Sequence, residues 1–192
     1  MHTIALALTL ATMTPLLAQT SSHYRITHTY TLGGEGRWDY IVPDPPNHRL
    51  FIARQNRLMV VDENSRTLLG EVTGIQGAHG TAVAEATGHG FATSGNDQSV
   101  VMFDLKTFQA LGRIPAAEDA DAIVYDPASN RVFTLNGDAH SSTVIDPRAG
   151  RLITNIPLGG NRNTGRPPAP AKCTRISPIS ARWLRSMPKQ RP

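Results

Sequence analysis

The chain has 192 residues, of which 19 are Lys or Arg and 15 are Asp or Glu, giving a formal net charge of +4. The charge is unevenly distributed: residues 161–192 carry eight basic residues and no acidic one, which leaves 11 basic and 15 acidic residues in residues 1–160. The same final segment holds six of the 14 prolines, which argues against one domain of uniform composition reaching the C-terminus. The single cysteine, Cys173, excludes an internal disulfide framework and a Cys-based zinc site.

Residues 1–18 are predicted to form a secretory signal peptide. Residues 3–18 are uncharged and mostly apolar, they are too short for a comfortable membrane span, and polar residues follow at positions 19–22. With cleavage near Ala18, we expect a periplasmic or secreted protein without a transmembrane segment. The alternative interpretation is an N-terminal strand or helix of the mature fold.

A repeat of 42 residues organises the centre of the chain. The segment LMVVDENSRTLLGEV at 58–72 reappears as VVMFDLKTFQALGRI at 100–114 and as STVIDPRAGRLITNI at 142–156. An Asp recurs at this spacing: Asp62, Asp104 and Asp146. A Phe recurs upstream of it: Phe51, Phe91 and Phe133. Because the first two Phe residues are 40 rather than 42 residues apart, the first repeat is predicted to have a hairpin shorter by two residues.

Each repeat has the pattern of four short strands. Opening strands are predicted at 38–42, 81–84 and 122–125; a second strand carries the Phe, a third ends at the periodic Asp, and a fourth follows a short turn. Four strands in about 42 residues is the pattern of one propeller blade. The sequence therefore predicts an all-β propeller of four-stranded blades.

The periodic residues are interpreted as structural. The Asp carboxylate is expected to accept backbone N–H groups in an Asx-type turn, and the glycines after the fourth strand are expected at positive φ in the turns between blades. No His or Glu recurs at a fixed distance from the Asp, which argues against a metal or catalytic role for it.

These segments, together with AHGTAVA at 78–84 and DAIVYDPASNRVFTLNG at 121–137, resemble the YVTN-type repeat of YncE-like exported bacterial proteins. The resemblance covers residues 24–160, with repeats at about 35–76, 77–118 and 119–160. It implies a seven-bladed propeller acting as a binding scaffold, with DNA or cell-surface partners suggested for some members. Fold-level analogy does not by itself assign a site.

Three repeats are fewer than the four to eight blades of a closed ring. The stretch ITHTYTLGG at 26–34 resembles the last strand of a repeat, and the pattern stops after Gly160. We interpret the chain as an incomplete ring from a truncated gene, with an out-of-frame tail at 161–192. The alternatives are a solvated, disordered tail and a cationic arm that binds nucleic acid or anionic lipid.

Candidate ligand contacts lie where the opening strands begin. The acidic run 118–121 contains Asp119 and Asp121, and His79 precedes the second opening strand, so these three are candidates for lining the channel or rim. Solvated loop charges and a hydrogen-bonded structural His are the competing explanations. His79 and Asp121 are not recognised as equivalent positions. Trp38 is expected to pack between blades, and the Ser, His and Asp of the 136–142 hairpin do not form a triad by adjacency alone.

We therefore expect a binding scaffold that contacts a protein or small ligand at its rim, uses no cofactor and no metal, and self-associates through exposed blade faces. An enzyme of the lyase, hydrolase or quinoprotein-dehydrogenase kind, with residues from several blades converging on the channel, is the alternative class. Nucleic-acid binding depends on the tail.

Overall fold

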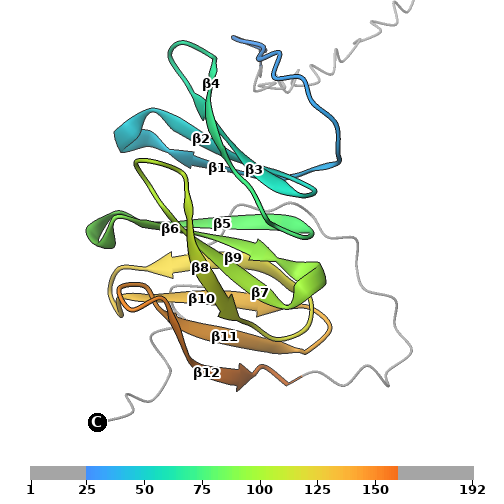
Figure 1. Ribbon diagram of the computed structural model, residues 1–192, viewed down its shortest axis with the longest axis vertical. Coiled ribbons are helices and arrows are strands. Elements are labelled where there is room, and N and C mark those ends of the chain that lie inside the picture. Colours follow the sequence, from blue (N-terminus) through green and yellow to red (C-terminus); the bar gives the residue numbers. More distant parts are fainter. Residues whose placement is uncertain (1–24, 160–192) are drawn as a thin grey trace, which may run out of the picture.

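The computed structural model describes residues 25–159, which form three four-stranded antiparallel sheets (Figure 1). Strands that are consecutive in the chain are neighbours in each sheet. Blade 1 contains β1 (Trp38–Asp44), β2 (Arg49–Arg54), β3 (Arg57–Asp62) and β4 (Leu68–Val72). Blade 2 contains β5 (Ala78–Ala84), β6 (His89–Ser94), β7 (Ser99–Asp104) and β8 (Ala110–Pro115). Blade 3 contains β9 (Ala120–Asp126), β10 (Arg131–Asn136), β11 (Ser141–Asp146) and β12 (Arg151–Pro157).

The all-β blade architecture predicted from the repeat is confirmed, and the three described blades form an unclosed ring. The only helical turns in residues 25–159 are three short 3-10 segments, η1 (Pro45–Asn47), η2 (Glu85–Thr87) and η3 (Gly95–Asp97). No helix in this range is long and apolar enough to cross a lipid bilayer. The predicted signal peptide at 1–18 and the tail at 161–192 lie outside the described residues.

The hairpin between the second and third strands explains the shorter first repeat. In blade 1 two residues, Gln55 and Asn56, connect β2 to β3, whereas four residues connect the equivalent strands of blades 2 and 3, at 95–98 and 137–140. Equivalent positions of blades 1 and 2 are therefore 40 residues apart before this turn and 42 residues apart after it. The predicted loss of two residues from a hairpin is confirmed.

The opening strands begin earlier than predicted, at Ala78 and Ala120 instead of positions 81 and 122. In each blade the pairing of the first two strands shifts register near the start of the opening strand, because an extra residue is inserted there. The residues before this bulge still pair with the neighbouring strand, for example Ala78 with Ser94. The alternating pattern that reveals a strand in sequence is broken at the bulge.

The turn after the third strand has the same construction in every blade. Asp104 Oδ1 accepts the backbone N–H groups of Lys106 and Thr107, each at 2.8 Å, and Asp62 and Asp146 accept equivalent bonds. These backbone hydrogen bonds lower the pKa of all three carboxyls below the usual value. The residue at positive φ in this turn is Arg66, Phe108 or Gly150. The blade geometry thus imposes a left-handed residue even where the sequence offers no glycine.

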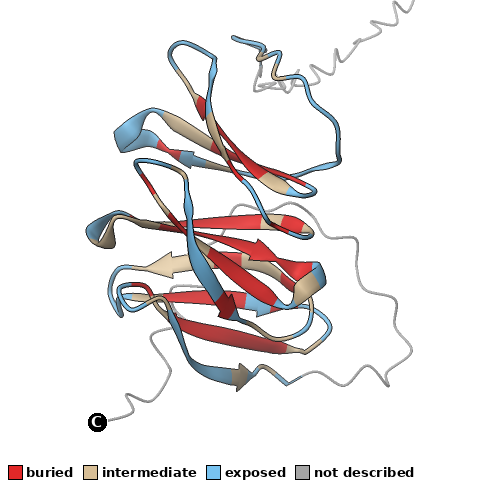
Figure 2. Cartoon of the chain, in the orientation of Figure 1, coloured by how far each residue is buried: buried red, intermediate tan, exposed pale blue. Residues whose placement is uncertain are grey.

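The core lies between the sheets. Phe51 of blade 1 and Phe103 of blade 2 are fully buried, with their ring centroids 5.9 Å apart. Phe91 of blade 2 is buried in a second cluster with blade 3, which includes Val132 and Ile145. Figure 2 shows buried residues concentrated on β5 and on the two middle strands of each sheet, and exposed ones on β12. The opening strands β1, β5 and β9 lie next to one another, as the strands that line the channel of a propeller do.

The segment before β1 covers part of blade 1. Tyr30 and Leu32 pack against a cluster of Ile52, Met59 and Val61, and the Tyr30 hydroxyl lies 3.2 Å from the backbone oxygen of Glu63. No strand is assigned to residues 26–34, although the sequence resembles a final strand. The segment nevertheless lies on blade 1 as β4 lies on blade 2, where Val72 belongs to the same buried cluster as Ala92, Val101 and Phe103.

The buried Arg54 fastens this segment. Its guanidinium donates hydrogen bonds to the backbone oxygens of four consecutive residues, 33–36, at 2.7 to 3.1 Å. It also stacks on the ring of Trp38, 3.7 Å from the ring centroid. Trp38 is 54% exposed, so the expectation that it packs between blades is wrong; its indole ring instead covers the buried Arg54 guanidinium.

Candidate functional site at the channel mouth

The bulges place three polar side chains together at one end of the opening strands. Asp39, His79 and Asp121 are each the second residue of their strand, in β1, β5 and β9. Each lies within the stretch where the pairing register shifts. Because a bulge re-aims the side chain that it carries, the same local feature in three blades directs these residues to a common place, which we call the channel mouth.

His79 stands between the two carboxylates. Its Nδ1 is 2.7 Å from Asp39 Oδ2, a hydrogen bond, and 3.9 Å from Asp121 Oδ1, a longer ion-pair distance. All three side chains are partly exposed, so solutes reach them. The carboxylate on Nδ1 fixes the orientation of the imidazole ring.

The charge balance at the mouth favours cations. Burial raises the pKa of the Asp121 carboxyl, the nearby carboxylates of Asp39 and Asp119 raise it further, and His79 partly offsets these effects. Two carboxylates, Asp39 and Asp121, therefore flank the His79 imidazole, and a third, Asp119, acts on Asp121. A positively charged group that reached this place would relieve the repulsion among them.

Asp119 lies beside this group, on the link between blades 2 and 3. Its backbone is in the left-handed region, with φ of 58°, and its carbonyl accepts the N–H of Gly137 at 2.8 Å. The Asp119 carboxylate occupies the space next to Gly137 that any larger side chain at 137 would need. Asp121 and Gly137 also line a hollow of about 390 Å³ bounded by Ala122, Leu135, Asn136, His140, Leu158 and Gly159.

Thr93 holds the bulges of two blades at a fixed separation. This buried side chain of β6 accepts a hydrogen bond from the N–H of Gly80 at 2.8 Å and lies 2.8 Å from the backbone oxygen of Asp121. It thereby joins the strand that carries His79 to the strand that carries Asp121. His79 also packs on Gly95, whose missing side chain leaves room for the ring.

The site has no arrangement for a metal ion in the part of the chain that the structure describes. Within residues 25–159, no group of three or more His, Asp and Glu side chains is placed to hold one. In the 136–142 hairpin the buried Asn136 amide donates to Ser141 Oγ at 3.1 Å and to Thr143 Oγ1 at 2.9 Å, which is a structural network.

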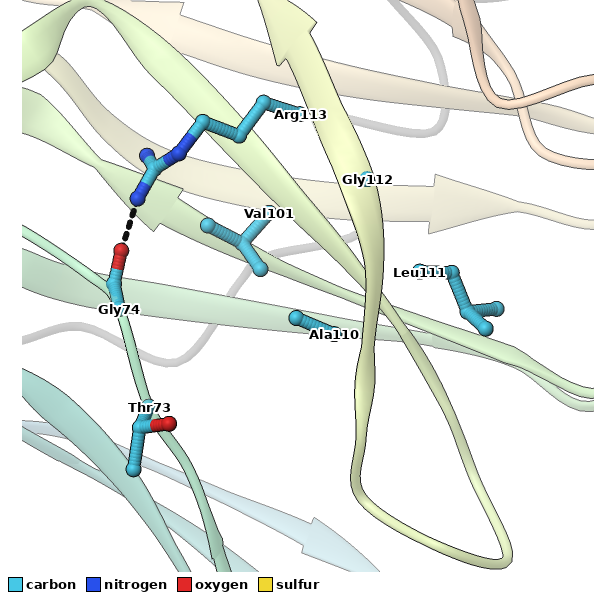
Figure 3. A pocket seen from close by; sticks show the side chains of 7 residues that line it. All are labelled: Thr73, Gly74, Val101, Ala110, Leu111, Gly112 and Arg113. Atoms are coloured by element: carbon cyan, nitrogen blue, oxygen red, sulfur yellow. Dashed lines mark hydrogen bonds between the residues drawn. The ribbon is translucent and has the colours of Figure 1, made fainter.

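Two further hollows lie on the blades. One of about 350 Å³ runs along the opening strands and is lined by Tyr40, Val42, Gly80, Ala82, Ala122 and Val124 among others, so an apolar wall continues from the channel mouth. The other, of about 230 Å³, is bounded by Thr73, Gly74 and β8, with the Arg113 guanidinium hydrogen-bonded to the Gly74 oxygen (Figure 3). Arg113 also binds Asp97 and Ser99, so it ties the link between blades 1 and 2 to blade 2.

Sequence reasoning named His79, Asp119 and Asp121 but missed Asp39, the closest partner of His79. Asp39 was missed because it was not recognised as the residue of blade 1 that is equivalent to His79 and Asp121. Asp39 and His79 are 40 residues apart, and His79 and Asp121 are 42 residues apart. Both spacings match the repeat, because the β2–β3 turn that follows Asp39 in blade 1 is two residues shorter than in the other blades. The three are therefore equivalent residues, although the sequence comparison treated His79 and Asp121 as non-equivalent.

The three stacked sheets and their adjacent opening strands define a β-propeller-like fold. No protein-family model matches the chain, and no curated protein matches it. Among solved structures, 838 chains are similar to this one.

One of these similar structures is hydrazine synthase from Kuenenia stuttgartiensis, with a TM-score of 0.59 and 18% sequence identity. The match covers 69% of this chain and 39% of that one, so this chain spans about two fifths of its length. At this identity the likeness establishes the fold alone.

Proposed function

We propose that this protein is an exported, YVTN or YncE-like binding scaffold that takes a cationic group of a ligand or partner protein at the channel mouth. The observation that carries the proposal is the placement of Asp39, His79 and Asp121 at equivalent positions of three blades, with His79 Nδ1 2.7 Å from Asp39 and 3.9 Å from Asp121. The 42-residue repeat and its motifs support the family assignment.

The chemistry of the mouth suits an amine or guanidinium. Charge-assisted hydrogen bonds from such a group to a carboxylate are stronger than neutral ones, and Asp39, Asp119 and Asp121 provide several acceptors in a small area. The apolar wall formed by residues such as Val42 and Ala82 would contact the rest of a ligand. A lysine- or arginine-bearing peptide combines both features.

Calorimetric titration of the full chain with a tetralysine amide peptide tests this function. We expect saturable binding that weakens with salt, and a several-fold loss of affinity in Asp39→Asn and in Asp121→Asn, of the order of 1 kcal/mol. Because the pKa of Asp121 is raised, binding should weaken as the pH falls through that raised value, where the carboxylate takes up a proton.

Glu71→Gln is the matched control, since Glu71 lies on β4, the outermost strand of the blade that carries Asp39, and pairs with Arg57. The control should bind as the unchanged chain does. Absence of binding by the unchanged chain, or an equal loss in the control, would contradict the proposal.

The second candidate function is an enzyme, favoured by the His79–Asp39 hydrogen bond. A histidine oriented by a carboxylate is a common general base, and the similar hydrazine synthase is an enzyme by name. Mass spectrometry of a ligand recovered after binding separates the classes. A chemically unchanged ligand supports the scaffold, whereas conversion that is lost in His79→Gln would favour a lyase, hydrolase or quinoprotein-dehydrogenase-like enzyme.

Export and the role of the tail are tested separately. N-terminal sequencing of the mature protein should find a start near position 19 if the signal peptide is cleaved after Ala18. Deletion of residues 161–192 should leave tetralysine binding intact, because the mouth lies in residues 39–121. If DNA binds the full chain and the deletion abolishes it, the tail carries a separate activity.

A further inference from the structure

An apolar side chain on the outward face of blade 1 is exposed where its equivalents are buried. Ile41 in β1 is 58% exposed, whereas Thr81 in β5 and Ile123 in β9 are 4% and 8% exposed. Thr81 and Ile123 are covered because a preceding blade packs against them. The exposure of Ile41 therefore marks the surface on which a preceding blade would dock.

The outward face of blade 3 shows the complementary exposure. Leu135 in β10 is 50% exposed, whereas its equivalents Ala53 in β2 and Thr93 in β6 are 1% and 0% exposed. The following blade covers these two. Leu135 is also the largest of the three side chains, and no blade within residues 25–159 covers it, whereas Phe133 and Val144 on the same face are 7% and 6% exposed.

A hydrogen bond between blades repeats in the same register. Arg49 Nη1 of blade 1 donates to the backbone oxygen of Leu105 in blade 2 at 2.6 Å, and His89 Nδ1 of blade 2 lies 2.9 Å from the backbone oxygen of Pro147 in blade 3. The next donor position in this series is Arg131 on blade 3. The preceding acceptor position is the backbone oxygen of Glu63 on blade 1.

Blade 3 also carries the residue set that blade 1 uses for docking. In blade 1 Asp44 binds the guanidinium of Arg49 at 2.6 Å, and that guanidinium lies 5.5 Å from the centroid of the Phe51 ring. The equivalent residues of blade 3 are Asp126, Arg131 and Phe133. The outward face of blade 3 is therefore built like a face that already binds a blade of this chain.

We propose that the outward face of blade 3 docks on the outward face of blade 1 of a second copy, with Arg131 of one copy donating to the Glu63 backbone oxygen of the other. This contact continues the interfaces between blades 1 and 2 and between blades 2 and 3. Two such contacts related by a two-fold axis join two copies head to tail into a closed ring of six blades, within the range that propellers adopt. The proposal is independent of the ligand at the channel mouth.

The N-terminal segment occupies part of this docking surface. Tyr30 and Leu32 lie in the place of a fourth strand of a preceding blade, and the Tyr30 hydroxyl contacts the same Glu63 oxygen that Arg131 would reach. The segment must move off blade 1 when β12 of the second copy arrives. It therefore competes with the second copy, and loosening it should strengthen the dimer.

Sedimentation equilibrium of the full chain tests the contact. We expect the unchanged chain to reach twice the chain mass as concentration rises, and Ile41→Asp and Leu135→Asp each to remain monomeric, because a charge would be buried in both interfaces of the ring. An equimolar mixture of the two variants should regain dimer, since a mixed pair retains one undamaged interface. Only a head-to-tail arrangement predicts this rescue.

Matched controls keep the outcome interpretable. Ile41→Thr introduces the residue found at the buried position 81 and should dimerise as the unchanged chain does, and Tyr30→Ala combined with Leu32→Ala should lower the dimer dissociation constant. Circular dichroism verifies the fold of each variant. A chain that stays monomeric at every accessible concentration, a mixture without rescue, or a weaker dimer on loosening the segment would each overturn the proposal.

Discussion

Gly90 shows how closely single residues are fitted in the core. A side-chain carbon at this buried position of β6 would overlap the ring of Phe103 on the neighbouring strand β7, which is fully buried against Phe51. Gly90→Ala should therefore lower the free energy of unfolding by about 1–3 kcal/mol, as overpacking typically does. Urea denaturation measures the change.

Gly112→Ala is the control for this substitution. Gly112 lies on β8 with no atom near the position that a side chain would take. The alanine there should change the unfolding free energy by less than about 0.5 kcal/mol. Similar losses at both glycines would mean that overlap with the Phe103 ring is not the cause and would contradict the packing explanation.

Asp121 connects the channel mouth to stability. Because burial raises the pKa of its carboxyl above 3.8, the folded protein binds a proton more readily than the unfolded chain, and stability rises as the pH falls through the interval between 3.8 and the raised value. At neutral pH the ionised group costs free energy. Asp121→Asn should then stabilise the fold, by less than about 1 kcal/mol because the side chain is nearly half exposed.

Denaturation at two pH values checks the sign. The advantage of Asp121→Asn should be present near neutral pH and shrink as the pH falls through the raised pKa, where the natural carboxyl becomes neutral. An advantage that grew on acidification would mean that attraction by His79 outweighs the burial of Asp121.

At the scale of single elements, the segment before β1 is held mainly by Arg54. Its guanidinium binds the backbone oxygens of residues 33–36, and hydrogen bonds to a charged group are worth about 1.5–3 kcal/mol each before exposure is discounted. Arg54→Met should lower the unfolding free energy by at least about 1.5 kcal/mol and speed tryptic cleavage after Arg37. Arg66→Met, on the exposed β3–β4 turn, should change neither quantity.

The strands illustrate what sequence could and could not predict. The periodic Asp and Phe residues revealed twelve strands and a shortened hairpin, because buried strands repeat their apolar pattern. The bulges produce no repeated apolar pattern in the sequence. His79 and Asp121 were therefore identified only as polar residues at the start of their strands, and Asp39 was not recognised as their equivalent. Alignment across the short β2–β3 turn could have found the trio, whereas the 2.7 Å approach of His79 to Asp39 required coordinates.

The Arg54 contact could not be foreseen at all. Its partners are backbone oxygens of residues 33–36, which carry no side-chain signal. A fully buried arginine in a strand usually indicates an acidic partner, and here the acceptors are carbonyl groups instead. Trp38, expected between blades, lies over this guanidinium.

Across the whole molecule, stability should be graded by blade. Blade 2 is packed on both faces within residues 25–159, whereas blades 1 and 3 each have one blade neighbour there. Native-state hydrogen exchange should accordingly give the highest opening free energies for β6 and β7 and the lowest for the exposed β12. Uniform protection of all three blades would instead indicate a single cooperative unit.

The two-residue turn between β2 and β3 has a consequence for how recognition could diversify on this architecture. The turns at 55–56, 95–98 and 137–140 all follow the strands that pair with the bulged openings, so all three border the channel mouth. Blade 1 has two fewer residues there than blades 2 and 3, and its sheet still has four strands. The strands therefore fix the frame while these turns tolerate insertion and deletion, which makes 55–56 the natural place to graft a longer loop and redesign what the mouth accepts.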